Sequence, residues 1–477
     1  MKSEECDLCV IGSGAGGSLV ACRAARSGLK VIILEQGPYV RAAQMTDSEP
    51  EMIPWLYKDG GLQMNSGLDM FILQGVCVGG STVLSNMVMM RAPQKVFDEW
   101  HRLGADFDAQ AIHRAYDRVE AELGARPAEA ANVSRSTHRF LQGARALGFT
   151  PQTMNKALGE CVGCGNCNIG CAFNTKRSAL TTYVQWAEAA GARVIADTEV
   201  ERLEHRRGHV SVVRARNTKT REELKVVARN VVVAAGAIGS SALLLKSRIE
   251  RNVGTRMSFN AGSMMIAEFG ERLDAFDADQ MTSYLLGDGF IVEPTSNPIM
   301  SSALTTPGWF ADHGELMKRQ PHLAYAGALV ATEATGRVVQ SRFWGHEETI
   351  FSAPPTDLAK LKRGLRTIAE VFFAAGALRV ILPTHNLRSI SSTRELDAID
   401  AIDSTRGISF GSAHPQGGNP WSDDKRLGVV DKDFAVHDFD NLFVVDASVF
   451  PSCIGVNPID TIMAVADYAS GRILARA

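Results

Sequence analysis

The start of the chain alternates between apolar runs and a glycine-rich turn. Residues 6–11 are mostly apolar and predict a buried parallel strand. Glycines follow at once, and residues 18–28 then show the spacing of a helix. A second apolar run, residues 30–35, predicts a second strand that ends in Glu35. This order of strand, turn, helix and strand is typical of an α/β domain built on a parallel sheet.

Hydrophobic periodicity predicts further elements along the chain. Helical spacing marks residues 108–124, 136–148 and 357–376, and strand-like runs occupy residues 193–203, 209–216 and 223–235. The last apolar helix is predicted to begin at Asn457 as its N-cap, with Pro458 in the first turn. Helices and strands therefore mix throughout the chain.

Length and composition add limits. A single hydrophobic core stops growing near roughly 250–300 residues, so 477 residues predict two domains. A net charge of −3 without a strongly basic block argues against a nucleic-acid partner. The longest apolar runs fall short of the ~20 residues that span a bilayer, so no transmembrane segment is expected. The first residues do not form a signal peptide, and we expect a cytoplasmic location.

The turn after the first strand carries Gly12, Gly14 and Gly17, which form a G-x-G-x-x-G motif. Glycines here allow the backbone to approach a pyrophosphate, which the helix N-terminus favours electrostatically. Glu35, at the end of the second strand, can accept hydrogen bonds from ribose hydroxyls. The motif alone does not separate FAD from NAD.

Three more blocks narrow the choice. Residues 73–93 hold a second glycine-rich loop, residues 228–247 read "ARNVVVAAGAIGSSALLLKS", and residues 414–473 begin with "HPQGGNP". With these blocks the chain resembles the glucose–methanol–choline (GMC) oxidoreductase family. The resemblance implies FAD and an α/β fold: a Rossmann-like FAD-binding domain of discontinuous segments, plus a substrate domain with an antiparallel sheet, similar to p-hydroxybenzoate hydroxylase.

On this resemblance the chain divides into three parts. The FAD-binding domain takes residues 1–99, 175–262 and 405–477. A helical and cysteine-containing insertion takes residues 100–174, and the substrate-binding domain takes residues 263–404.

Family members oxidise alcohols by passing a hydride to the flavin while a base removes the hydroxyl proton. The resemblance places that base at His414 and its partner at Asn457. A histidine titrates near pH ~6.5, which suits proton removal at neutral pH. An amide at Asn457 can donate to the developing alkoxide, although capping of the last helix is an alternative role.

The resemblance also implies FAD contacts outside the first motif. These are Gly79, Gly80, Ser81, Asn86, Val200, Asp446, Ala447 and Pro458. For Asp446 the alternative is a strand-end carboxylate that caps the next turn. Some family members bind FAD covalently through a histidine after the paired glycines; residues 81–86 contain none, so we predict noncovalent FAD.

A short loop gathers four of the nine cysteines, Cys161, Cys164, Cys167 and Cys171. Their spacing, C-x2-C-x2-C-x3-C, is that of bacterial ferredoxins. It predicts one iron–sulfur cluster. The cluster is [4Fe–4S] if all four thiolates bind; if three bind, it is [3Fe–4S] or takes a remote ligand. A zinc site and an inert cysteine loop are the alternatives.

Together these features predict an FAD-dependent alcohol dehydrogenase for an apolar or aromatic alcohol. Its electrons would leave through the cluster to an external acceptor, either a redox protein or a quinone-like molecule. The alternatives are an O2-dependent alcohol oxidase with a structural cysteine loop, a sugar dehydrogenase, and a non-catalytic flavin electron-transfer protein.

Overall fold

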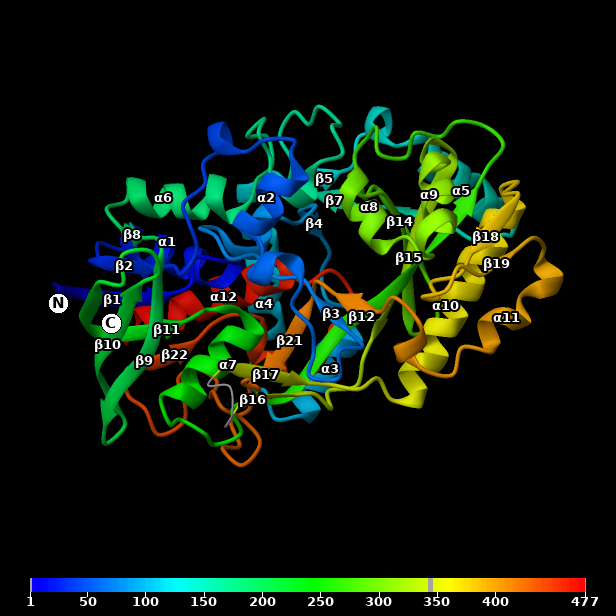
Figure 1. Ribbon diagram of the computed structural model, residues 1–477. Helices are drawn as coiled ribbons and strands as arrows, with labels where there is room; N and C mark the ends of the chain where they lie inside the picture. The colour runs from blue at the N-terminus through cyan, green and yellow to red at the C-terminus, as the bar shows by residue number, and fades with distance from the viewer. Residues whose placement is uncertain (1, 342–345, 477) are drawn as a thin grey trace.

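The computed structural model describes residues 2–341 and 346–476 (Figure 1). Within these ranges the strands form two large sheets. The first sheet has seven strands in the order β8-β2-β1-β11-β10-β9, with β22 also paired to β11. Its strands are β1 (Lys2–Ile11), β2 (Val31–Leu34), β8 (Arg193–Ile195), β9 (Thr198–Arg206), β10 (His209–Asn217), β11 (Glu223–Val233) and β22 (Leu442–Val444).

The centre of this sheet is parallel, as the apolar runs predict. β1 pairs in parallel with both β2 and β11, and β22 adds a further parallel strand. β1 begins at Lys2 rather than at residue 6 because its polar first residues pair with Leu224 and its successors on β11. Helix α1 (Ala15–Arg26) packs against α6 (Tyr183–Ala189) and α12 (Ile459–Leu474).

The second sheet has ten strands in the order β19-β18-β12-β15-β14-β13-β6, with β20 and β21 paired to β12 and β3 paired in parallel to β20. Its strands are β3 (Phe71–Ile72), β6 (Gln152–Thr153), β12 (Thr255–Glu268), β13 (Ser283–Leu286), β14 (Phe290–Thr295), β15 (Leu323–Ala331), β18 (Arg379–Ile381), β19 (Ser389–Ile390), β20 (Gly411–Ser412) and β21 (Pro415–Gly418). The pairings of β12 with β15, β18, β20 and β21 are all antiparallel.

Helices cover both sheets, and a few short strands lie apart from them. The remaining helices are α2 (Glu49–Leu56), α3 (Gln94–Arg102), α4 (Ala109–Leu123), α5 (Arg135–Ala146), α7 (Gly236–Lys246), α8 (Ile299–Thr305), α9 (Phe310–Lys318), α10 (Pro355–Ala374) and α11 (Asp397–Asp400). The short strands are β4 (Val88–Met89), β5 (Arg126–Pro127), β7 (Asn155–Lys156), β16 (Arg337–Gln340) and β17 (Glu347–Ile350). Helix α10 packs on β15 and β12, with α5 beside it.

The mixed α/β fold, with one mainly parallel and one antiparallel sheet, is confirmed. The helices predicted at 108–124, 136–148 and 357–376 are present as α4, α5 and α10. The run 193–203 is divided into β8 and β9, because Asp197 lies between them with a φ of 50°. The domain boundaries remain a prediction.

The last helix corrects one prediction. α12 begins at Ile459, and Pro458 rather than Asn457 is its N-cap. Proline fixes φ near −65° and lacks an N–H, so it suits a helix start without any side-chain cap. The side chain of Asn457 is thereby left for another contact.

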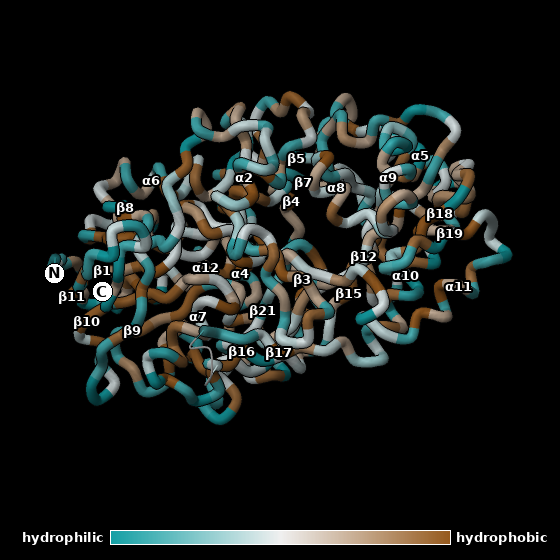
Figure 2. The backbone as a smooth tube through the Cα atoms, viewed as in Figure 1, coloured by the Kyte–Doolittle hydropathy of each residue, from teal (hydrophilic) through white to brown (hydrophobic). Residues whose placement is uncertain are grey.

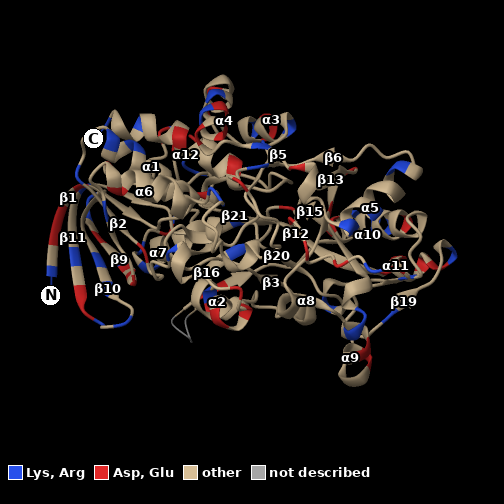
Figure 3. Ribbon diagram, turned by 90° about the horizontal axis from the view of Figure 1, so that it is seen from above, with Lys and Arg blue, Asp and Glu red and all other residues tan. Residues whose placement is uncertain are grey.

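The buried hydrophobic residues form one main core that runs through both sheets. Figure 2 shows hydrophobic residues concentrated inside the molecule and hydrophilic residues at outer turns such as the one beside α11. Figure 3 shows both signs of charge interspersed along the outer helices and strands. Among the described residues, no helix is both long and apolar enough to cross a membrane.

Candidate active site

A cavity of about 500 Å³ is lined by residues of both sheets. At one end it is lined by the turn after β1, which includes Gly12 and Gly14. Elsewhere its lining includes His414 and Asn457, which are separated from that turn by some four hundred residues of chain. The cavity therefore brings together the predicted nucleotide-binding motif and the predicted catalytic pair.

The two glycine loops are pressed against each other. A Cβ built on Gly80 would lie 2.9 Å from the Cα of Gly14, and the N–H of Gly79 donates to Ser13 Oγ at 3.0 Å. A Cβ on Gly17 would lie 2.1 Å from the carbonyl oxygen of Gly12, so this glycine allows α1 to pack closely on the turn. α1 begins after Gly14 with no side-chain cap, which leaves its first backbone N–H groups available to an anion.

Glu35 lies in the cavity wall at the end of β2. One carboxylate oxygen accepts from the backbone N–H and the hydroxyl of Ser13, at 3.1 and 2.7 Å, and the other accepts from Gly37 N–H at 3.0 Å. Burial raises the pKa of Glu35 above its ordinary value. A carboxylate offers about four acceptor sites, so Glu35 can still accept from hydroxyl groups of a ligand.

The structure places most of the predicted FAD-contact residues in the cavity wall. Those that line it are Gly12, Gly14, Glu35, Gly80, Ser81, Asn86, Val200, Asp446, Ala447 and Pro458. Gly17 and Gly79 lie behind the wall and shape the two loops. Their roles as ligand contacts remain predictions.

Asp446 has the capping role that the sequence left open. It accepts hydrogen bonds from Ser448 N–H at 2.8 Å and, at the start of α7, from Gly236 N–H at 2.9 Å and Ser240 Oγ at 2.5 Å. Asp446 therefore ties the strand β22 to the first turn of α7 while it also borders the cavity.

His414 lies between β20 and β21. Its Nδ1 is 3.4 Å from Asn260 Nδ2, and Nε2 has no hydrogen-bond partner among the described residues. Burial lowers the pKa of His414 to about 4. The imidazole is therefore neutral at physiological pH and can accept a proton.

Glu293 on β14 is a cavity residue that the sequence did not single out. Its side chain is 3% exposed, and its Oε1 has no hydrogen-bond partner among the described residues. Burial raises the pKa of Glu293 to about 8, and a hydrogen bond from the Asn457 side chain opposes that shift only partly. Asn457 therefore contacts a carboxyl group that is largely protonated at neutral pH, instead of capping α12.

The raised pKa of Glu293 predicts a pH effect on stability. The folded protein keeps a proton up to about pH 8, whereas the unfolded chain loses it near the ordinary 4.5, so stability falls as pH rises between these values. Glu293→Gln stays neutral throughout, so its Tm relative to the parent should increase steadily from about pH 5 to about pH 8. A Tm difference between variant and parent that stays constant across that pH range would contradict a neutral Glu293.

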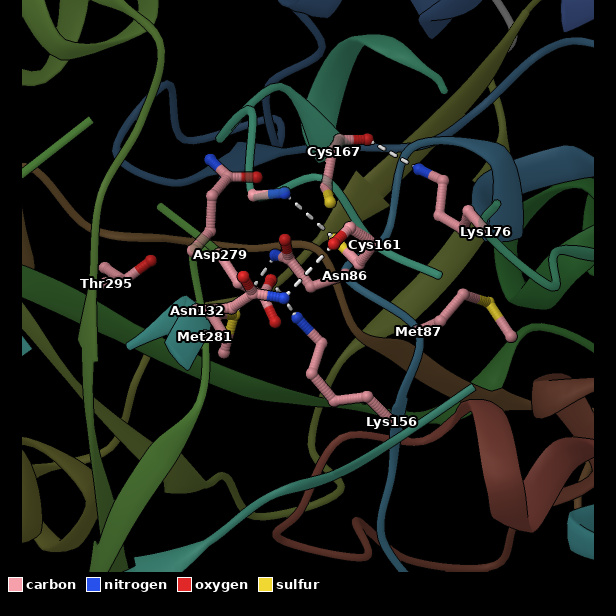
Figure 4. Close-up of polar contacts among 12 residues, drawn as sticks. Asn86, Met87, Asn132, Lys156, Cys161, Cys167, Lys176, Asp279, Met281 and Thr295 are labelled. Carbon is pink, nitrogen blue, oxygen red and sulfur yellow. Dashed lines mark hydrogen bonds and ion pairs between the residues drawn. The ribbon is translucent and has the colours of Figure 1, made fainter. Parts of the chain in front are cut away.

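The cysteine loop borders the same cavity. Asn168, between Cys167 and Cys171, lines the cavity, and its carbonyl oxygen accepts from Tyr57 Oη at 2.6 Å. Beneath the loop Lys176 donates to the Cys167 carbonyl at 2.7 Å (Figure 4). Buried Lys156, which pairs with Asp279, lies nearby in the same view.

The four thiols do not form a ready metal site. Across residues 2–341 and 346–476, no group of three or more His, Cys, Asp or Glu side chains is arranged to hold a metal ion. Burial raises the pKa of Cys161 and Cys164, and that of Cys167 to about 11. Only Cys171 has a lowered pKa, because hydrogen bonds from Thr175 and Lys176 outweigh its burial. The loop as arranged therefore contains no ready metal site among the described residues, and the iron–sulfur cluster remains a prediction.

Three family models match the chain. Two describe GMC oxidoreductases, an N-terminal part over residues 54–260 and a C-terminal part over residues 337–466. The chain belongs to the GMC oxidoreductase family. An FAD-binding domain model also matches residues 7–49, which contain the first glycine loop and Glu35.

Individual relatives agree with this assignment. A GMC-type oxidoreductase of Mycobacterium tuberculosis is 31% identical over 480 residues, covering 98% of this chain and 76% of the relative. A long-chain-alcohol oxidase of Arabidopsis thaliana is 26% identical over 518 residues, covering 98% and 68%. The crystal structure of pyridoxine 4-oxidase from Mesorbium loti has the same fold, with a TM-score of 0.77, 17% identity and coverage of 98% and 99%.

The residues of this GMC oxidoreductase fit FAD. The uncapped start of α1 and the two apposed glycine loops offer backbone N–H groups to a pyrophosphate, and the cavity continues from there to His414. The prediction of an FAD-dependent oxidoreductase for CH–OH donors is confirmed at the level of the family.

Proposed function

We propose that this GMC oxidoreductase oxidises an apolar or aromatic alcohol to the corresponding carbonyl compound. The observation that carries the proposal is the placement of His414, a neutral imidazole with a free Nε2, in the cavity that also contains the glycine loops. The names of relatives, including the long-chain-alcohol oxidase, support an alcohol as the substrate class.

His414, Asn457 and Glu293 have separate roles in this reaction. Nε2 of His414 accepts the hydroxyl proton of the alcohol and holds it as imidazolium. FAD, when bound, supplies the acceptor for the hydride that leaves the carbinol carbon. The amide of Asn457 and the protonated carboxyl of Glu293 offer hydrogen-bond donors to the substrate oxygen as negative charge develops on it.

The preference for an apolar alcohol rests on the lining supplied by the second sheet. Three apolar side chains line the cavity there: Met264 on β12, Leu329 on β15, and Met281 in the loop before β13. Methionine side chains are flexible and adapt to irregular apolar ligands. These three side chains offer no strong hydrogen-bond partners for the many hydroxyl groups of a sugar.

Anaerobic mixing with a panel of alcohols tests this proposal. We expect the flavin absorbance of the FAD-loaded protein to bleach with long-chain or aromatic alcohols, and far less with sugars. Bleaching by sugars alone would support a sugar dehydrogenase. Absence of bleaching with every alcohol and sugar tested would support a non-catalytic flavoprotein and reject the proposal.

The route of the electrons after the flavin is a separate question. The relative named as a long-chain-alcohol oxidase supports O2 as the acceptor. The position of Asn168 at the cavity wall, together with the exposed Cys164, supports the dehydrogenase, whose electrons would go to a redox protein or a quinone-like acceptor. Hydrogen peroxide formed in equal amount to the carbonyl product would favour the oxidase.

Metal analysis of the purified protein tests the cysteine loop. If the loop binds a cluster, several irons and acid-labile sulfides per chain are expected, and Cys164→Ser should lower both. Val162→Ala, at an exposed position in the same loop, is the matched control and should keep them. Zinc at one per chain, or no metal after anaerobic purification, would reject the cluster.

A further inference from the structure

The surroundings of His414 are set by the register of β12. Pro415 pairs with Phe259, and Gly411 pairs with Gly262, so the segment between them lies beside Asn260. Asn260 is fully buried, its carbonyl accepts from Ser412 Oγ at 2.8 Å, and its backbone N–H donates to the His414 carbonyl at 3.4 Å. The Asn260 amide therefore has little freedom except rotation about its own side-chain bonds.

The orientation of this amide decides which nitrogen of His414 carries the proton. With Nδ2 of Asn260 donating to Nδ1, a neutral imidazole must carry its proton on Nε2, and Nε2 cannot accept a proton from an alcohol. In that orientation Oδ1 of Asn260 is also buried with no partner, which costs free energy. A half-turn of the amide exchanges the two atoms, so that Oδ1 gains the Nδ1–H of His414 as its donor and the lone pair of Nε2 is left free.

We propose that Asn260 is a positioning residue whose side-chain oxygen accepts the Nδ1–H of His414, which keeps the lone pair of Nε2 available in the cavity. The same contact stabilises the imidazolium that forms when Nε2 takes the substrate proton, because Nδ1 is a donor in both states. The separation of 3.4 Å is long for a hydrogen bond, and such contacts often tighten only when the ligand is bound. This inference rests on the proposed role of His414 as the base.

Few other groups near His414 could fix its tautomer. Glu293 on β14 shares the cavity, and the thiol of Cys453 lies nearby, where it accepts from Gln416 Nε2 at 3.8 Å. Burial is the cause of the lowered pKa of His414, with no contribution from a charged group. An uncharged carbonyl oxygen at Nδ1 is thus the available means of fixing the tautomer.

Nitrogen NMR of the FAD-loaded, histidine-labelled protein tests the tautomer without any turnover. The His414 signals are assigned by comparison with His414→Gln. We expect Nδ1 to be protonated in the parent, and the proton to redistribute towards Nε2 in Asn260→Leu. Ser258→Ala, on the same strand, is the matched control and should leave the signals unchanged. Protonation of Nε2 in the parent would overturn the inference.

The pH profile of flavin reduction provides a second readout. Asn260→Leu should reduce the rate at pH 7 about tenfold or more, because less of the reactive tautomer is present. Asn260→Asp places a carboxylate beside Nδ1–H and should raise the pKa on the acidic limb by about one unit or more. Profiles identical to the parent in both variants would reject the role of Asn260. Failure of the parent to reduce its flavin with any alcohol would instead reject the proposed function.

Discussion

Replacing His414 by Ala is expected to slow flavin reduction by an accepted alcohol roughly 10²–10⁴-fold, the usual contribution of a general base. The variant leaves the hydroxyl proton without an acceptor, while the glycine loops that hold FAD are untouched. Anaerobic stopped-flow absorbance measures the rate directly. His138→Ala, an exposed histidine on α5, is the control and should behave like the parent. If His414→Ala reduces its flavin at a rate within threefold of the parent, His414 is not the base.

The second large effect is expected at Gly80. A Cβ there would lie 2.9 Å from the Cα of Gly14, which is backbone and cannot move aside without opening the glycine turn. We therefore expect Gly80→Ala to bind FAD at least roughly a hundredfold more weakly and to purify largely colourless. Flavin content and titration of the apoprotein with FAD measure the loss.

Gly124 provides a matched control for this substitution. Its φ of +63° is close to the +56° of Gly80, but a Cβ at Gly124 would meet nothing within 4 Å. Gly124→Ala thus carries the same left-handed backbone strain of about 1–2 kcal/mol without the clash. Equal loss of FAD in both variants would mean that strain, rather than contact between the two loops, explains the result.

Much of the FAD half could be predicted from the sequence because its signals are local. The first glycine motif, its flanking strands and Glu35 lie within residues 2–35 and occupy the expected places. The helices α4, α5 and α10 were also predictable, since each shows apolar residues at helical spacing.

The missing parts of the site depend on contacts between distant segments. Glu293 is one acidic residue in a short strand, and only the pairing of β14 with β15 brings it to the cavity. Asn260 adjoins His414 because β12 pairs with β20 and β21, about 150 residues further along the chain. For Asn457, the sequence left capping of α12 open as an alternative to its role as partner of the base, and Pro458 at the N-cap makes that cap unnecessary.

The long strand β12 has a consequence for how a substrate can enter. It pairs with β21 near its beginning, with β20 at Gly262 and with β18 at its end, so a ladder along this one strand links the segment of His414 to the far side of the second sheet. A clamshell motion about this strand would break that ladder at many positions at once. We therefore expect the two sheets to keep their relative positions during turnover, and the substrate to enter through loops at the rim of the cavity. Hydrogen exchange of the backbone amides along β12 should then be uniformly slow.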